Sequence, residues 1–454
     1  MSSIAARPIH RSGLRGQFPG HRDAQEQALG TRVRLFPQMP VDGAMIEPET
    51  ILLSTPPEEI GPGPSDDRLY VIDPLDKPIA YGRNAALPGH DPIFQIPPWF
   101  GPLHAPVLPS ADGHLDHIPI GTPEFEAAHV YGATRYVLDI WEDYLGEPIT
   151  WHFAREYERL EIVLLRHFDN ATAGYGYMEF GTAITEDGEI SPFSLNFDII
   201  AHEVGHLIIF SLLGVPDLDR IDGEFFAFHE SAADIVTLIS SLHFDSVVDQ
   251  LLAETSGNLY TYNQLTRFAE LSSCEQIRLA SNRKRMSSFA DGWHKEHHLS
   301  QPLTGAMFDI FVDIFHEHLL NRGLVSASTE DLADHLQRDD QAQDIIQAIF
   351  DDAYIANPLG FKEALLDARD EAALGLAATW RSLRAEGLTF REVGNQLLSA
   401  DRELNGGRYQ RLIANNLDWR QIGEIEAGPQ LSQPGMDSHL FSTRTQSPDE
   451  QGLF

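Results

Sequence analysis

The chain has 454 residues, of which 42% are hydrophobic, enough for a buried core and for two packed subdomains. Acidic residues outnumber basic ones by 68 to 32, which gives a formal net charge of −36. Such a surface repels phosphate backbones and anionic lipids, so nucleic acids and membranes are not expected as partners. Cys274 is the only cysteine, which excludes an intrachain disulfide.

The amino-terminal residues 1–66 are rich in Pro, Gly and charge and lack sustained periodicity, so we expect a flexible leader and linker. This region holds no continuous apolar segment typical of a secretory signal. No later stretch approaches the roughly 20 apolar residues that span a bilayer. The sequence therefore predicts no cleavable signal peptide and no membrane anchor, which leaves a cytoplasmic location or export by a non-standard route.

Residues 67–213 are predicted to form a subdomain that contains both strands and helices. Alternation in RLYVIDPLDKPIAYG predicts a short strand pair. Apolar residues at helical spacing, with a proline at the start, predict a helix over 123–145. The apolar run 162–165 and the alternation of Tyr175, Tyr177 and Phe180 predict further strands.

Residues 214–425 are predicted to form a mainly helical subdomain, and 426–454 a disordered tail. Counting the helix that ends the first subdomain, helical segments are expected near 197–213, 224–242, 302–321, 341–356, 359–385 and 389–402. The fold class is therefore α+β, with a small amino-terminal mixed sheet followed by a mostly helical carboxy-terminal part.

The segment FDIIAHEVGHLIIFSLLG carries the strongest chemical signal. His202 and His206 lie four residues apart, so their rings project from one helix face and can share a metal ion. Glu203 lies beside that face, where its carboxylate can take a proton from an attacking water. A chain with 20 histidines can contain this motif by chance. Its apolar neighbours, however, would bury the helix, and burying these groups without partners is costly.

A third ligand is predicted in the apolar helix GEFFAFHESAADIVTLISSL. A catalytic zinc site uses three protein ligands and keeps one position open. Glu230 can complete such a set, and Asp234, four residues on, can accept the free ring N–H of a ligand histidine, most simply His202. His229 points about 100° away from Glu230 on the helix and is expected to be structural.

Together, HEVGH and ESAAD resemble the thermolysin-like gluzincin zinc peptidases. The closing segment LLSADRELNGGRYQRLIANN is more similar to bacterial and fungal relatives than to thermolysin itself. The resemblance implies a zincin-like fold, a Zn²⁺ ion and peptide or protein substrates. It places Asn170 and Ala171 on an edge strand that pairs with the substrate backbone. It also makes His298 the donor to the tetrahedral intermediate, with His297 as the alternative.

Two features depart from the family pattern. The stretch between Leu207 and His229 contains no tyrosine, so the tyrosine that assists oxyanion binding in thermolysin has no counterpart. Asp198 matches a calcium-binding position, but the other acids of that site are not found, which leaves calcium doubtful. The family's arginine that binds the substrate carbonyl was not matched to any arginine in this sequence.

The sequence thus predicts a zinc-dependent endopeptidase in which Glu203 takes a proton from water and later delivers it to the leaving amine. One alternative is a catalytically silent, zinc-stabilised scaffold, whose fourth metal position would be closed by protein. A second alternative is a zinc hydrolase that acts on another amide or an ester. This second alternative would use the same residues as the peptidase.

Overall fold

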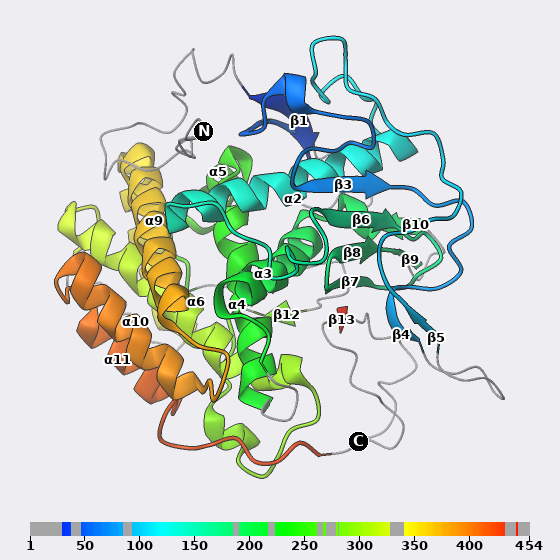
Figure 1. Cartoon of the computed structure of the whole chain (residues 1–454). Helices are drawn as coiled ribbons and strands as arrows, with labels where there is room; N and C mark the ends of the chain where they lie inside the picture. Colours follow the sequence, from blue (N-terminus) through cyan, green and yellow to red (C-terminus); the bar gives the residue numbers. More distant parts are fainter. Residues whose placement is uncertain are drawn as a thin grey trace.

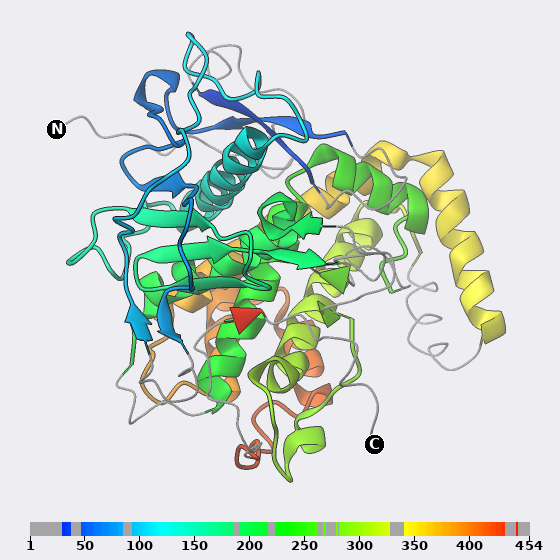
Figure 2. The ribbon, with the colours of Figure 1, turned by 90° about the vertical axis from the view of Figure 1, so that its right-hand side faces the viewer.

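Figure 1 shows the computed structural model, in which strands gather in one half of the molecule and helices fill the other. A view turned by 90° shows the same division (Figure 2). The structure describes residues 30–37, 47–84, 93–184, 190–216, 223–260, 267–268, 278–279, 281–326, 340–431 and 442–443. The predicted α+β class is confirmed. Cys274, the first 29 residues and most of the expected tail lie outside the described residues.

Part of the expected leader is folded. Strands β1 (Thr31–Leu35) and β2 (Glu49–Leu53) form an antiparallel pair. Val33 and Leu35 are fully buried against helix α2 (Pro123–Leu145). At Gly132 of α2 a Cβ atom would lie only 2.8 Å from the Val33 methyl groups. The flexible-linker prediction is therefore wrong for these two strands, whose partner lies nearly 100 residues further along the chain.

A five-stranded sheet forms the centre of the strand-rich half, with the order β13-β7-β8-β6-β3. Strands β3, β6 and β8 are parallel, and β7 runs antiparallel between β8 and β13. The bounds are β3 Leu69–Ile72, β6 Leu160–Leu164, β7 Ala171–Gly174, β8 Tyr177–Phe180 and β13 Ser442–Thr443.

The predicted strand pair within RLYVIDPLDKPIAYG is not formed. Instead β3 pairs with β6, and β4 (Gly82–Asn84) pairs with β5 (Ile93–Gln95). A second small pair consists of β9 (Thr182–Ile184) and β10 (Ile190–Pro192). A third joins β11 (Arg267–Phe268) to β12 (Arg278–Leu279). Periodicity found the strand at residue 69, but its partner comes from a distant segment.

One face of the central sheet carries a buried ion pair. Lys77 Nζ lies 2.6 Å from Glu179 Oε1, and both side chains are fully buried. The other oxygen of Glu179 accepts a hydrogen bond from the Tyr81 amide at 2.7 Å. Tyr81 and Tyr70 donate their hydroxyls to Glu161. These bonds fix the segment that follows β3 across this face, while α2 packs on the other side.

The helical half follows the predicted periodicity closely. Asn196 caps α3 by accepting the Ile199 amide. Helices α5 and α11 were not among the predicted segments, and η3, η6 and η2 are short 3₁₀ turns. The bounds are α3 Phe197–Leu213, α4 Gly223–Ser241, α5 Asp245–Thr255, α6 Glu296–Asn321, α8 Asp340–Ala356, α9 Pro358–Ser382, α10 Phe390–Asn405, α11 Gln410–Trp419, η2 Pro57–Glu59, η3 Phe193–Leu195 and η6 Met286–Phe289.

Helix α6 begins six residues earlier than expected, at Glu296. Pro302 therefore lies inside the helix rather than at its first position, and its ring removes the hydrogen bond that would reach the His298 carbonyl. His298 accordingly lies in the first turn of α6, rather than before the helix as the predicted start at residue 302 implies. A proline this near a helix start misled the boundary prediction.

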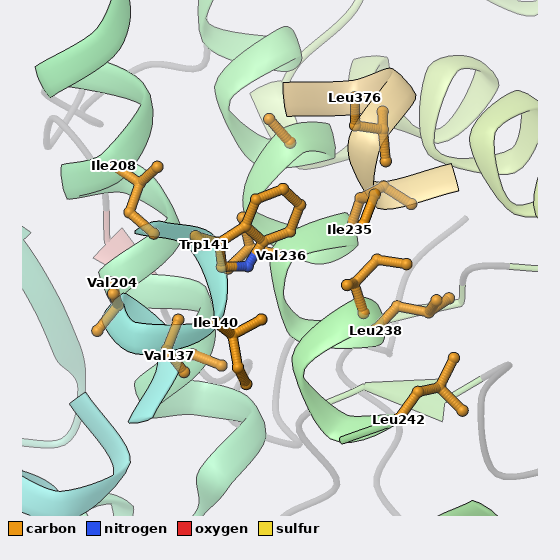
Figure 3. Close-up of a cluster of buried hydrophobic side chains, with 14 of the residues drawn as sticks. Val137, Ile140, Trp141, Val204, Ile208, Ile235, Val236, Leu238, Leu242 and Leu376 are labelled. Carbon is orange, nitrogen blue, oxygen red and sulfur yellow. The ribbon is translucent and has the colours of Figure 1, made fainter. Parts of the chain in front are cut away.

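The main core lies where α2, α3, α4 and α9 meet (Figure 3). Trp141 of α2, Ile208 of α3 and Val236 of α4 approach one another there, each with 0% exposure. These apolar contacts hold the three helices together.

No single helix among the described residues is long and apolar enough to cross a membrane. Helices α4 and α5 meet the length and composition test only when taken together, across a bend of 92°.

We expect stability to fall as the pH drops from about 6.5 to 4, because buried histidines must stay neutral. The ring of His129 accepts a hydrogen bond from the Phe36 amide at Nε2, so Nδ1 carries the proton and donates to the Ser194 carbonyl. Burial lowers the pKa of His129 to about 4. The unfolded chain therefore binds more protons than the folded one in this range. Protonation of this residue lowers the free energy of unfolding by at most about 3 kcal/mol.

Urea unfolding at pH 7, 5.5 and 4.5 measures this loss. The variant His129→Gln keeps one acceptor and one donor and should show a shallower pH dependence. The matched control His104→Gln changes an exposed ring and should retain the wild-type slope. Equal slopes for all three proteins would contradict the assignment.

Candidate metal site

Helices α3 and α4 bring three buried potential ligands together. The nearest ligand atoms of His202, His206 and Glu230 all lie within 4.8 Å of one another. His202 Nε2 is 3.4 Å from Glu230 Oε2, and His206 Nε2 is 3.8 Å from Glu230 Oε1. The two imidazole rings are nearly perpendicular, with centroids 4.6 Å apart. All three side chains are buried. We call these residues the metal cluster.

The geometry and chemistry of this cluster fit a zinc ion. A tetrahedral zinc with bonds of about 2.1 Å separates two of its ligand atoms by about 3.4 Å. The separations of 3.4 and 3.8 Å lie close to this value. Two imidazole nitrogens and one carboxylate oxygen form a donor set that zinc accepts, and it leaves a fourth position for another group.

Close packing of the two helices makes the cluster possible. A Cβ atom added to Gly205 would lie 2.8 Å from the Cα of Ala233 and 3.2 Å from the Cβ of Val236. Only a glycine fits at this contact, which lies between the two histidines on α3 and beside Glu230 on α4. The glycine of HEVGH and the small residues of ESAAD thus set the distance between the helices.

Two further carboxylates flank the cluster. Asp234 Oδ1 lies 3.2 Å from His202 Nδ1, the ring nitrogen that does not face Glu230. A carboxylate at this nitrogen holds the proton there and turns Nε2 toward the metal position. Glu203 is completely buried on α3, between the two histidines in sequence. The structure thus brings Asp234 into contact with His202 and buries Glu203 on the helix that carries both histidines, and the roles of the two acids stay predictions.

Of the two adjacent histidines on α6, the structure places His297 at the cluster. His297 Nδ1 lies 2.6 Å from Glu230 Oε2, and 31% of the side chain is exposed. His298, the first choice from sequence, is an exposed residue in the same helical turn. The geometry therefore favours His297, because successive residues on a helix point about 100° apart.

The two residues expected to contact the substrate backbone lie at the start of β7. Asn170 precedes the strand and Ala171 begins it. Strand β7 packs against α3, the helix that carries the two histidines. The Asn170 carbonyl accepts the Gly181 amide at 2.9 Å. The strand that Ala171 begins thus packs on the metal helix, and the part of both residues in substrate binding stays a prediction.

Three residues near the cluster have other roles. His229 is fully buried, and burial lowers its pKa to about 3, so the ring is neutral in the folded protein. Asp198 accepts a hydrogen bond from the Ser241 hydroxyl at 3.2 Å, which ties α3 to α4. The pKa of Tyr177 is raised by burial first and then by the negative charges of Glu179 and Glu203. The Tyr177 ring packs against Tyr81, with centroids 5.0 Å apart.

A hollow of about 630 Å³ opens at the amino-terminal end of α4. Its walls include Phe226, Trp293 and Phe390. Glu224 also lines it and accepts the Phe390 amide at 2.7 Å, which joins α4 to α10. Phe226 lies one helical turn before Glu230, so this space begins close to the metal cluster.

No family model matches the chain, and no curated protein matches its sequence. Among solved structures, the chain is similar to the precursor of protealysin, a metalloproteinase from Serratia proteamaculans. The match has a TM-score of 0.39 and 11% identity, and it covers 79% of this chain and 88% of that chain. Such a loose match transfers no residue role, so the assignment of a function depends on the site itself.

We expect Gly205→Ala to weaken both folding and metal binding. The added methyl group collides with the α4 backbone, and overpacking of this kind costs about 1–3 kcal/mol. The shift between α3 and α4 should also lower zinc affinity about 10- to 100-fold, as disturbance of groups that orient ligands does elsewhere. Urea unfolding and competitive zinc titration measure the two effects.

Gly375→Ala on α9 is the matched control. A Cβ atom at Gly375 meets nothing within 4 Å. The change should leave zinc affinity intact and stabilise the helix by up to about 1 kcal/mol. If Gly205→Ala bound zinc as tightly as the wild type, the close helix contact would not control the site.

Proposed function

We propose that the chain is a zinc-dependent endopeptidase of the thermolysin-like type. The observation that carries the proposal is the buried cluster of His202, His206 and Glu230, with Glu203 adjacent on the same helix. These residues would hold the zinc ion, and Asp234 would orient His202. Bound zinc would supply a Lewis acid that polarises the scissile carbonyl and makes a water molecule more acidic.

Glu203 is the residue that would move the proton. Its carboxylate would accept a proton from the attacking water and then deliver it to the leaving amine nitrogen. The new C–O bond would form first and leave an oxyanion on the former carbonyl oxygen. The peptide C–N bond would then break as the amine nitrogen receives the proton, so the products are a carboxylate and an amine. The full burial of Glu203 supports this role, because exclusion of bulk water strengthens its interactions with the reacting groups.

His297 is the best-placed donor for the developing oxyanion. Its ring lies against Glu230 and is also partly open to solvent, so it can face both the cluster and a bound substrate. A donor aimed at the charge that develops in the transition state lowers the barrier. We therefore assign this role to His297 in preference to His298.

Glu203→Gln should keep the metal and lose peptide cleavage. The amide has nearly the same shape as the carboxylate but cannot accept the proton. Elemental analysis of purified protein and cleavage of a broad peptide library test the two halves of this prediction on the same samples. We expect about one zinc per chain in both proteins and products only from the wild type.

Glu230→Gln serves as the contrasting variant, because it should lose zinc and activity together. One zinc per chain without cleavage of any peptide would instead favour the silent scaffold or a hydrolase of another amide or ester. Absence of zinc binding by the wild type would refute the proposal.

His297→Gln should lower kcat about 10²- to 10³-fold with little change in KM, the range for loss of one oxyanion donor. His298→Gln is the matched control on the same helical turn and should keep most of the activity. Zinc content should be unchanged in both variants. A large loss of kcat in the His298 variant alone would show that the original sequence prediction was correct.

A further inference from the structure

We propose that the carboxy-terminal strand β13 occupies the sheet edge where a peptide substrate would bind, and so acts as an internal competitor. The strand contact itself is independent of any activity. Only the predicted competition with a peptide substrate rests on the proposed function.

The first observation is the position of β7. Within the described residues, β13 is its sole neighbour on the side away from β8. Without β13, β7 would be the edge strand of the central sheet, with backbone amides and carbonyls available for pairing. Extended peptides bind to such edges by adding a strand. Because β7 packs against α3, a peptide held there would lie near His202 and His206.

The second observation is the register. Ser442 lies opposite Thr172, and Thr443 lies opposite Ala171, in antiparallel orientation. The tail therefore pairs with the first half of β7, including Ala171, which is the part nearest Asn170. Figures 1 and 2 both place β13 directly beside β7. A substrate backbone and the tail cannot use these same groups at once.

Hydrogen bonds hold the chain in place just before the tail. The Leu431 amide donates to the Trp293 carbonyl at 2.6 Å, and the His294 ring lies 3.1 Å from the Leu431 carbonyl. The Gly428 amide donates to the Phe289 carbonyl at 2.8 Å. The chain is thus held just before the start of α6, a few residues from His297. The chain therefore has two fixed points, one before α6 and one at β7.

The short connection makes the competition effective. Ten residues, 432–441, separate Leu431 from Ser442. For two groups joined by a connection of this length, we expect an effective concentration of about 1 mM. A backbone contact with a dissociation constant of about 1 mM would therefore be formed about half of the time. Such a contact would raise KM without changing the reacting groups.

Amide hydrogen exchange tests the contact without any need for activity. The full-length double variant Ser442→Pro/Thr443→Pro removes both N–H groups of β13. Amides at Ala171 and Thr172 that face β13 should then exchange faster than in the wild type, while β8 amides keep their protection. Gln446→Pro, beyond the strand, is the control and should change neither. Unchanged exchange on β7 in the double variant would overturn the proposal.

Kinetics test the competition. With a peptide substrate, the double variant should show KM lowered about two- to tenfold at unchanged kcat. A synthetic peptide of residues 438–447 added to the double variant should inhibit competitively. Faster exchange with unchanged KM would overturn the role as competitor. If neither protein cleaves any peptide, the proposed function fails, and the exchange experiment still decides whether the tail occupies β7.

Discussion

The close contact between α3 and α4 is the constraint on which the rest of the site depends. At Gly205 the two backbones approach so closely that a single methyl group would not fit. This distance lets a carboxylate on α4 meet two imidazoles on α3. The surrounding apolar core from α2 and α9 then holds both helices in place (Figure 3). The part of the core that surrounds α3 and α4 therefore stabilises one short interhelical distance.

The molecule contains two buried polar groupings with different chemistry. On one face of the sheet, Lys77 and Glu179 form an ion pair of opposite charges, so the protein itself balances the buried carboxylate. In the metal cluster, Glu230 lies among imidazoles that are neutral unless they are protonated. A divalent cation balances such a set far better than neutral rings do. The difference in charge balance indicates that the Lys77–Glu179 pair is structural and that the metal cluster is a binding site.

Helical features were predictable from sequence because helix geometry is local. The spacing of four residues in HEVGH, and again between Glu230 and Asp234, places side chains on one face wherever the helix lies. Strand pairing is not local. The partner of β3 and the burial of β1 against α2 depend on residues far along the chain, and the same alternation is compatible with several partners. For this reason the helices were found and the strand partners were not.

The sequence by itself determined which residues can bind a metal, since residue type and helical spacing define a ligand set. Tertiary structure decided which of two adjacent histidines reaches Glu230. His297 and His298 differ by about 100° around α6, and the start of that helix was hidden by Pro302. Tertiary structure also decided that β13 pairs with β7, because a short polar strand carries almost no signal until an open sheet edge supplies its hydrogen bonds.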